Sequence, residues 1–170
     1  KVSPAAVSVE LSGATNMLLH APSIVDTAEA KQMLMRDSTI RQVADAWTHL
    51  DIAVVGIGAF EPPSTLLEEG GFSADDLSEL TAAGAVGDMC MNFFDARGRQ
   101  VSIPLADRSI GISFEQLLEV ECVVAVAGGA NKATAVAGAL LSRIVNVLVI
   151  DDITARAVLT KIIGEAFKCH

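Results

Sequence analysis

Three short runs of hydrophobic residues, rich in β-branched side chains, are spaced along the chain at 52–57, 123–127 and 145–150. Polar positions do not alternate with the hydrophobic ones, which is the pattern of strands buried on both faces of a parallel sheet. Residues 16–20 form a weaker candidate for a fourth strand. The hydrophobic pattern therefore predicts a sheet with helices on both of its faces.

Between these runs, hydrophobic positions recur at the spacing of an amphipathic helix. Helices are predicted at 27–35, 39–49, 131–143 and 153–167. A further helix opens at Ser73, a suitable N-cap residue, with Asp76 three positions on in a pattern much like a capping box. Strands that alternate with helices through right-handed crossovers predict an α/β domain with a mostly parallel sheet.

One segment departs from this alternation. Residues 89–94 and 99–103 both resemble strands, and the turn between them contains Gly98. We expect a β-hairpin here, as an antiparallel excursion on the parallel sheet. The chain has no internal repeat, low-complexity tract or linker, so a single domain is predicted over 1–170. Because residues 1–12 resemble the tail of a helix, we expect the domain to be part of a longer chain.

Composition and charge narrow the classes of protein. Half of the 170 residues (51%) are hydrophobic, which is enough to build a core and excludes a disordered chain. Twelve basic against twenty-one acidic residues give a net charge of −9. Such a charge disfavours direct contact with DNA or with an anionic membrane. The hydrophobic runs are about half the length of the roughly 20 residues that a bilayer span needs, so no membrane partner is predicted.

The cysteines and histidines predict neither disulfides nor a metal site. The three cysteines are widely spaced and odd in number, which fits a reduced, cytoplasmic protein. Cys90 and Cys122 stand in strand-like surroundings and are expected to be small core residues. The three histidines lack the spacing of metal ligands. We therefore predict no metal and no other cofactor.

Candidate binding residues gather where the predicted strands end, and in open α/β sheets ligands bind outside the carboxyl ends of strands. The first strong strand runs into Gly56 and Gly58, and the second runs into Gly128, Gly129 and then Lys132. Glycine N–H groups, the positive end of the following helix and Lys132 could together hold an anion. A solvated lysine beside a tight strand-to-helix turn explains the same residues, and the local pattern does not separate the two interpretations.

Asp88 is the second candidate, at the boundary between a predicted helix and an apolar strand. A lone carboxylate there could accept hydrogen bonds from the hydroxyls of a polyol, or it could simply be a turn or cap residue. Asp151 and Asp152 are interpreted as the N-cap of the last helix rather than as metal ligands. No phosphate-binding P-loop, nucleophile elbow or zinc-protease motif is present, and no catalytic residue is predicted.

Seven segments in a fixed order carry a resemblance to a known family. They are 19–25, 51–58, 84–88, 92–99, 124–129 followed by Lys132, 146–152 and 154–156. Each is weak alone, but the ordered set covers nearly the whole chain. It resembles the sugar-binding effector domain of SorC/DeoR-type bacterial transcriptional regulators.

The resemblance implies a fold like that of glucosamine-phosphate isomerase and ribose-phosphate isomerase, used for binding and not for catalysis. It implies that the effector is a phosphorylated sugar or polyol. It also implies a homo-oligomer, either a dimer or a tetramer, whose affinity for DNA changes when the effector binds. By motif, Lys132 matches the lysine that meets the ligand phosphate, and Asp88 matches the acid that meets sugar hydroxyls. The glycines that would line the same crevice are Gly56, Gly58, Gly128 and Gly129.

The chain departs from the family pattern in two ways. The helix-turn-helix module, through which the family contacts DNA, and about the first third of the effector domain have no counterpart before Lys1. Residues 66–72 supply acids and glycines where some bisphosphate-sensing members have a basic residue. We therefore expect a monophosphate, or a neutral ligand end near this loop. The alternative function is an isomerase-like enzyme that acts on a sugar phosphate, for which Asp88 is the one obvious general base.

Overall fold

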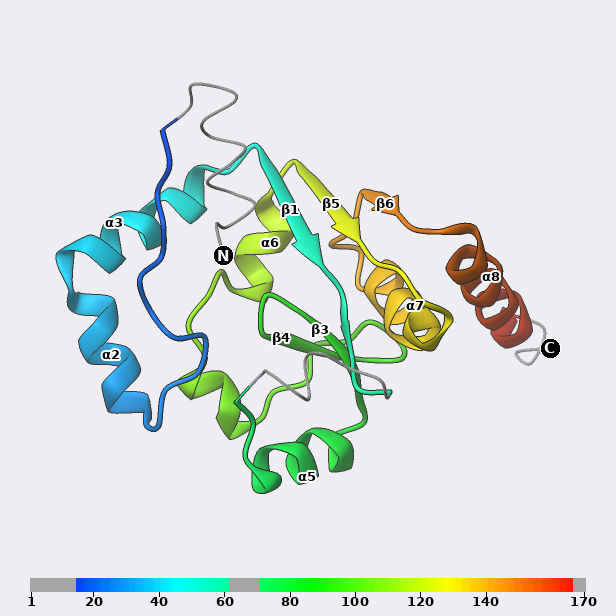
Figure 1. The fold of residues 1–170 in the computed structure, drawn as a ribbon, viewed down its shortest axis with the longest axis horizontal. Helices are drawn as coiled ribbons and strands as arrows, with labels where there is room; N and C mark the ends of the chain where they lie inside the picture. The colour runs from blue at the N-terminus through cyan, green and yellow to red at the C-terminus, as the bar shows by residue number, and fades with distance from the viewer. Residues whose placement is uncertain (1–14, 62–70, 167–170) are drawn as a thin grey trace.

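The computed structural model describes residues 15–61 and 71–166 (Figure 1). The helices, with η marking 3₁₀ turns, are α2 Ala28–Arg36, α3 Ser38–Ala46, η1 Trp47–His49, α5 Ala74–Ala82, η2 Pro104–Arg108, α6 Phe114–Glu119, η3 Ala130–Lys132, α7 Ala133–Leu141 and α8 Asp152–Ala166. The strands are β1 Ile52–Gly56, β2 Gly58–Ala59, β3 Ala85–Met89, β4 Asn92–Asp95, β5 Cys122–Val126 and β6 Val147–Val149. Within the described residues, no helix has both the length and the hydrophobicity to cross a membrane.

The three strong strand predictions are confirmed as one parallel sheet in the order β1-β5-β6. Ile52 lies beside Cys122, and Val124 lies beside Val147. Helices α6 and α7 complete the α/β architecture that the sequence predicts. The weaker strand prediction at 16–20 is wrong, because this segment has no strand partner among the described residues. It runs as an extended segment with half-exposed apolar side chains before a single bridge from Ile24 to Ser109.

The predicted hairpin exists, but its position differs from the prediction. β3 and β4 pair around Cys90 and Met91, and with β2 they form a separate antiparallel sheet. Cys90 and Met91 adopt φ values of 53° and 66°, a region that favours glycine or asparagine. The turn therefore carries no sequence signal, and Cys90 is exposed instead of buried in the core. The turn at Gly98 is also present, and Gln100 after it forms an isolated bridge to Phe94.

Close packing against α7 requires glycine at two positions. A Cβ atom at Gly87 would lie 2.6 Å from the Ala135 Cβ and 2.5 Å from the Gly58 carbonyl oxygen. A Cβ atom at Gly138 would lie 2.8 Å from the carbonyl oxygen of Asp95. All three separations are too short for real side chains, so these two glycines let the antiparallel sheet lie directly on α7. The packing places the β3 residues next to the start of that helix.

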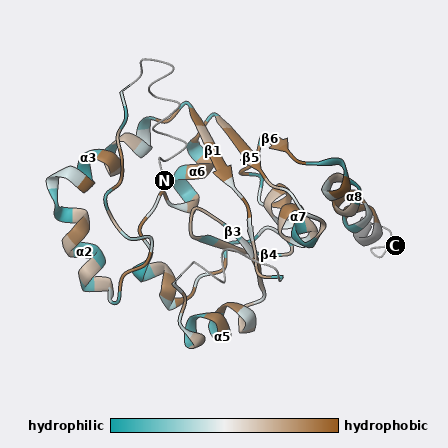
Figure 2. Ribbon diagram, viewed as in Figure 1, coloured by the Kyte–Doolittle hydropathy of each residue, from teal (hydrophilic) through white to brown (hydrophobic). Residues whose placement is uncertain are grey.

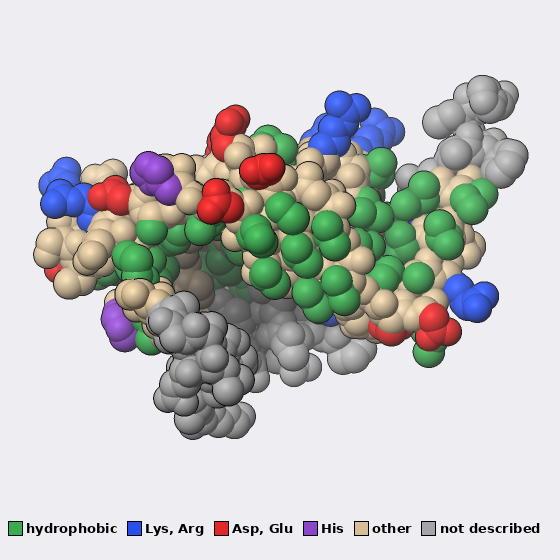
Figure 3. All heavy atoms as spheres, turned by 90° about the horizontal axis from the view of Figure 1, so that it is seen from above, with side chains coloured by type: hydrophobic (Ala, Val, Ile, Leu, Met, Phe, Trp, Pro, Cys, Tyr) green, Lys and Arg blue, Asp and Glu red, His purple; other side chains and the backbone are tan. Residues whose placement is uncertain are grey.

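One face of the parallel sheet is covered and the other is not, within the described residues. On β1, Ala53 and Val55 pack into the main core together with side chains of β5, α6 and α7. Ile52 and Val54 point the other way, with 60% and 71% of their surface exposed. Strands β1, β5 and β6 are coloured as hydrophobic in Figure 2, and Figure 3 shows hydrophobic side chains gathered on one surface of the molecule. The expectation of strands buried on both faces is therefore wrong for this part of the chain.

Capping boxes begin two of the helices. The predicted N-cap at Ser73 is confirmed, and the Asp76 side chain accepts hydrogen bonds from the Ser73 N–H and hydroxyl. Arg108 forms an ion pair with the buried Asp76 and connects α5 to η2. Helix α6, which the sequence analysis did not predict, has a capping box of Ser113 and Gln116. That serine–glutamine spacing was the signal for it.

Candidate functional site

The loops that follow β1 and β5 meet at the carboxyl edge of the parallel sheet. The Lys132 N–H donates to the Gly129 carbonyl (2.9 Å), which closes the 3₁₀ turn η3. Lys132 is the N-cap of α7 and not a residue of its first turn. Its ammonium group donates to the Ile57 carbonyl at 2.9 Å, next to the end of β1. Lys132 therefore joins the two predicted glycine segments.

Asp88 lies in the same place because its strand pairs with β2. Gly58 is its register partner across the antiparallel sheet, and only 6% of the Asp88 surface is exposed. The Met91 N–H donates to its carboxylate at 3.0 Å. Burial raises the pKa of Asp88 to about 6, although the Met91 N–H and the positive charge of Lys132 act in the opposite direction. The fold thus brings the two charged candidates within electrostatic reach of each other.

The four predicted glycines lie along this edge. Gly56 ends β1 beside Val126 and is exposed, and a Cβ atom added there would meet nothing within 4 Å. Gly58 lies beside Asp88 in the small sheet. Gly128 and Gly129 begin the turn that leads to Lys132. Gly129 has a φ of +107°, a backbone conformation that residues with side chains rarely adopt.

The Gly129 N–H is already engaged by the protein. It donates to the Asp151 carboxylate at 3.0 Å and to the Thr154 hydroxyl oxygen at 2.8 Å. The anion at this glycine turn is therefore an internal carboxylate in the present structure. The sequence analysis left open whether these N–H groups meet a ligand anion or only belong to a tight turn, and the structure does not test the ligand interpretation.

Asp151 is the N-cap of α8, as the sequence predicted. Its carboxylate accepts from the Thr154 N–H at 2.8 Å and from the Thr154 hydroxyl at 2.7 Å. These bonds, with the Gly129 N–H, lower the pKa of Asp151 to about 2. Thr154 is fully buried. Sequence reasoning gave Thr154 no role in the site, because its contact to Gly129 joins residues 25 positions apart.

Glu61 is a second residue that sequence reasoning missed. Its carboxylate accepts a hydrogen bond from the Thr134 hydroxyl at 2.8 Å, and its carbonyl accepts from the Asn131 side chain at 3.4 Å. These contacts place the negative charge of Glu61 beside the first turn of α7, which follows Lys132 in the chain. In the segment 66–72, from which the sequence analysis argued for a monophosphate or a neutral ligand end, residues 66–70 lie outside the described residues.

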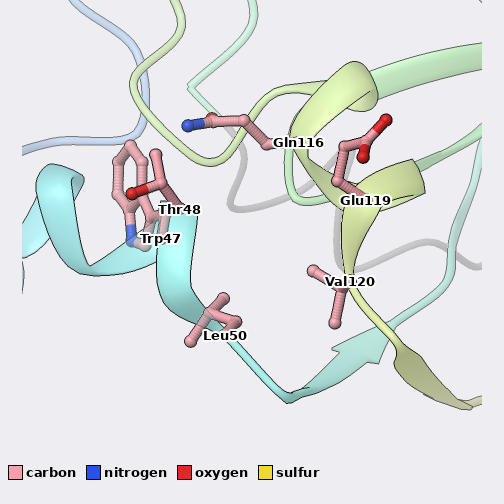
Figure 4. Close-up of a pocket in the computed structure, with 6 residues that line it drawn as sticks. All are labelled: Trp47, Thr48, Leu50, Gln116, Glu119 and Val120. Carbon is pink, nitrogen blue, oxygen red and sulfur yellow. The ribbon is translucent and has the colours of Figure 1, made fainter.

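Three cavities among the described residues have neither Asp88 nor Lys132 in their lining. One, of about 280 Å³, lies between η1 and α6 and is lined by Trp47, Leu50 and Val120 among others (Figure 4). Leu50 and Val120 precede β1 and β5, so this groove is at the amino edge of the sheet. A cavity of about 440 Å³ runs along β1, and a third of about 140 Å³ adjoins the Cys90–Met91 turn.

The pair of Lys132 and Asp88 suits a ligand with an anionic end and hydroxyl groups. The present partner of the ammonium is a neutral carbonyl, and an anionic oxygen forms a stronger, charge-assisted bond. The ionised carboxylate offers lone pairs to several hydroxyl donors. No group of three metal-ligating side chains occurs within 15–61 and 71–166, and the site offers binding groups of opposite charge.

Comparisons with known proteins identify the family of this chain. A family model described as "Putative sugar-binding domain" matches residues 6–160. The chain is 35% identical to the deoxyribonucleoside regulator of Bacillus subtilis over 82% of its length, and 38% identical to the transcriptional regulator LsrR of Klebsiella pneumoniae over 84%. These matches cover 44% and 45% of the two relatives, so the chain spans about half their length.

A solved structure extends the likeness to the fold. A transcriptional regulator from Streptococcus pneumoniae superposes with a TM-score of 0.85 at 29% identity, covering 92% of this chain and 60% of that one. The family model matches nearly the whole chain, including every predicted site residue. The chain therefore belongs to this family of sugar-binding domains.

Proposed function

We propose that this chain is the ligand-sensing part of a transcriptional regulator and that it binds a phosphorylated sugar or polyol. The observation that carries the proposal is the meeting of Lys132 and Asp88 at the carboxyl edge of the sheet. Membership of a sugar-binding-domain family and the regulator names of the relatives support binding, rather than turnover, as the role of this site.

The phosphate end of the ligand is assigned to Lys132. A phosphate oxygen takes the place of the Ile57 carbonyl as the partner of the ammonium. The hydroxyl end is assigned to Asp88, which is buried and has one backbone donor. Gly56 and Gly58 let the ligand approach the backbone closely because they carry no side chains, and Gly128 bounds the site on the β5 side.

A single phosphate fits this arrangement best. Glu61 places a carboxylate beside the first turn of α7, next to the turn that carries Lys132. A second phosphate near this carboxylate would be repelled, whereas neutral hydroxyls would find an acceptor. A sugar or polyol monophosphate is therefore favoured over a bisphosphate.

Regulation follows from a population shift between a DNA-competent and a released state, to which the ligand binds with different affinity. The net charge of −9 disfavours DNA contact by this chain, and we assign that contact to a helix-turn-helix module elsewhere in the regulator. A cytoplasmic homo-oligomer, dimer or tetramer, completes the proposal.

The domain is proposed to be the C-terminal part of a longer effector domain. The uncovered side of the sheet, with Ile52 and Val54 exposed, supports this. The superposition covers 60% of the solved regulator from Streptococcus pneumoniae, so the rest of that protein has no counterpart in this chain. Hydrophobic faces of parallel sheets are normally covered by helices.

Thermal stability with a panel of monophosphorylated sugars and polyols tests the proposal. A ligand at a hundred times its dissociation constant stabilises the fold by about 2.7 kcal/mol. We expect one compound to raise the melting temperature of the natural chain and to have no effect on Lys132→Met. Lys31→Met is the matched control, because the Lys31 ammonium also donates to a carbonyl, that of Ala106, at 2.9 Å.

Two results would contradict the proposal. One is a panel without any stabilising compound, and the other is a shift that survives in Lys132→Met. Isomerisation of a panel compound by the purified chain would instead favour the enzyme alternative. Tight binding of fructose bisphosphate would overturn the preference for one phosphate.

A further inference from the structure

The turn that carries Lys132 is held by two residues from the start of α8. The Gly129 N–H donates both to Asp151 and to the Thr154 hydroxyl oxygen. Thr154 also donates its hydroxyl and its N–H to Asp151. Together the three residues form a closed network, here called the Gly129 clamp, between the end of β5 and the first turn of α8.

The clamp holds the backbone at Gly129, whose φ angle is one that residues with side chains rarely adopt. Gly129 has a φ of +107°, and its carbonyl accepts the Lys132 N–H at 2.9 Å. The residue held by the clamp through its N–H therefore also starts, through its carbonyl, the 3₁₀ turn that ends in Lys132. Releasing Gly129 would free this turn to relax and would move the ammonium away from the Ile57 carbonyl.

Burial and charge make the clamp persistent. Thr154 is fully buried, so breaking its bonds would leave polar groups without water as a replacement partner. Asp151 is ionised in the neutral range, and the hydrogen bonds from Thr154 and Gly129 lower its pKa to about 2. A charged acceptor strengthens each of the hydrogen bonds that it receives.

We propose that Asp151 and Thr154 are positioning residues of the ligand site, which orient Lys132 through Gly129 and link ligand occupancy to the first turn of α8. The part that concerns ligand rests on the proposed function. The linkage is reciprocal: whatever holds Lys132 in place also stabilises the clamp, and the clamp raises affinity for the ligand. Neither residue needs to contact the ligand.

Amide hydrogen exchange tests the clamp without any ligand. Thr154→Val keeps the shape of the buried side chain and removes its hydroxyl. We expect exchange at the Gly129 and Lys132 amides to accelerate at least tenfold in this variant and to return to the natural rate in Thr154→Ser. Thr160→Val is the control, since the Thr160 hydroxyl donates within α8, to the Arg156 carbonyl. Unchanged exchange at Lys132 in Thr154→Val would overturn the proposal.

A second variant tests the clamp in case the Thr154→Val chain does not fold. Asp151→Asn keeps the size of the side chain and still suits an N-cap, but it removes the charge that Gly129 and Thr154 share. We expect the same two amides to exchange faster, whereas Asp152→Asn, at the exposed next position, should leave them unchanged. Equal effects of the two substitutions would overturn the proposal.

Titration with inorganic phosphate, followed by the Lys132 signals, tests the consequence for affinity. We expect the dissociation constant to rise about tenfold in Thr154→Val and to recover in Thr154→Ser. Equal affinities in the two variants would contradict the link to the ligand site. If phosphate fails to bind the natural chain, the proposed function loses its anion site, and the exchange experiment still decides whether the clamp positions Lys132.

Discussion

Asp88 carries a cost in stability that the fold would avoid with a neutral side chain. Its pKa rises from the ordinary aspartate value of 3.8 to about 6, chiefly because the side chain is buried. For an acid with a raised pKa, the native state holds its proton more tightly than the unfolded state. Its contribution to stability is therefore greatest below pH 4 and is lost as the pH rises through 6. Above that pH, the buried charge costs about 3 kcal/mol.

Replacing Asp88 with asparagine is expected to stabilise the protein at neutral pH. The difference in unfolding free energy from the natural chain should grow between pH 4 and 6.5 and reach about 2 kcal/mol, because asparagine still accepts from the Met91 N–H. Denaturant unfolding over this pH range measures it. Asp45→Asn, at an exposed position of α3, should give no such difference.

The same substitution should weaken ligand binding, because the amide accepts fewer hydroxyl bonds than a carboxylate. A gain in stability with a loss of binding would identify Asp88 as a residue kept for function. A variant that is destabilised at pH 7, or that binds ligand unchanged, would contradict this account.

At the residue scale, the sequence predicted the two charged site candidates but not the residues that hold them in place. Lys132 and Asp88 stood out because each is a lone charge in an apolar, glycine-containing setting, and the family resemblance supplied the roles predicted for them. Thr154 and Glu61 could not be predicted as part of the site, since their partners lie 25 and 73 residues away. Such contacts exist only once the β5, β6 and β2 segments have been brought together by folding.

At the scale of elements, the glycines between the small sheet and α7 determine where Asp88 lies. Gly87→Ala is expected to destabilise the protein by about 1–3 kcal/mol, because the added Cβ collides with Gly58 and Ala135 and neither can move freely. Thermal or denaturant unfolding measures this loss. In Gly56→Ala, where the Cβ meets nothing within 4 Å, stability should change by less than about 1 kcal/mol. Equal effects would contradict the close packing.

Strand and helix predictions succeeded where hydrophobic runs or periodic patterns were long, as in β1, β5 and α8. The hairpin was misplaced because Cys90 and Met91 form its turn without glycine or asparagine. The exposure of one sheet face could not be predicted either. Ile52 and Val54 are as hydrophobic as the buried Val55, so the strand shows no alternation in its sequence.

At the scale of the whole molecule, the uncovered sheet face should govern the solution behaviour of this chain. Large exposed apolar patches on soluble proteins promote association. Val54→Lys is therefore expected to fold normally, to bind less of a hydrophobic dye and to self-associate less in sedimentation experiments, since Val54 is 71% exposed on an edge strand. Val55→Lys should unfold the chain, because Val55 is buried. Unfolding of both variants would contradict the assignment of the exposed face.

The most direct test of the ligand site is a map of backbone amide shifts as a monophosphorylated sugar is added to the isotope-labelled chain. We expect the largest shifts at Gly58, Asp88 and Lys132, at the carboxyl edge of the sheet, and their loss in Lys132→Met. Shifts confined to the groove of Trp47 and Gln116 at the opposite edge, or an absence of shifts, would contradict the assignment of Asp88 and Lys132 as the ligand site.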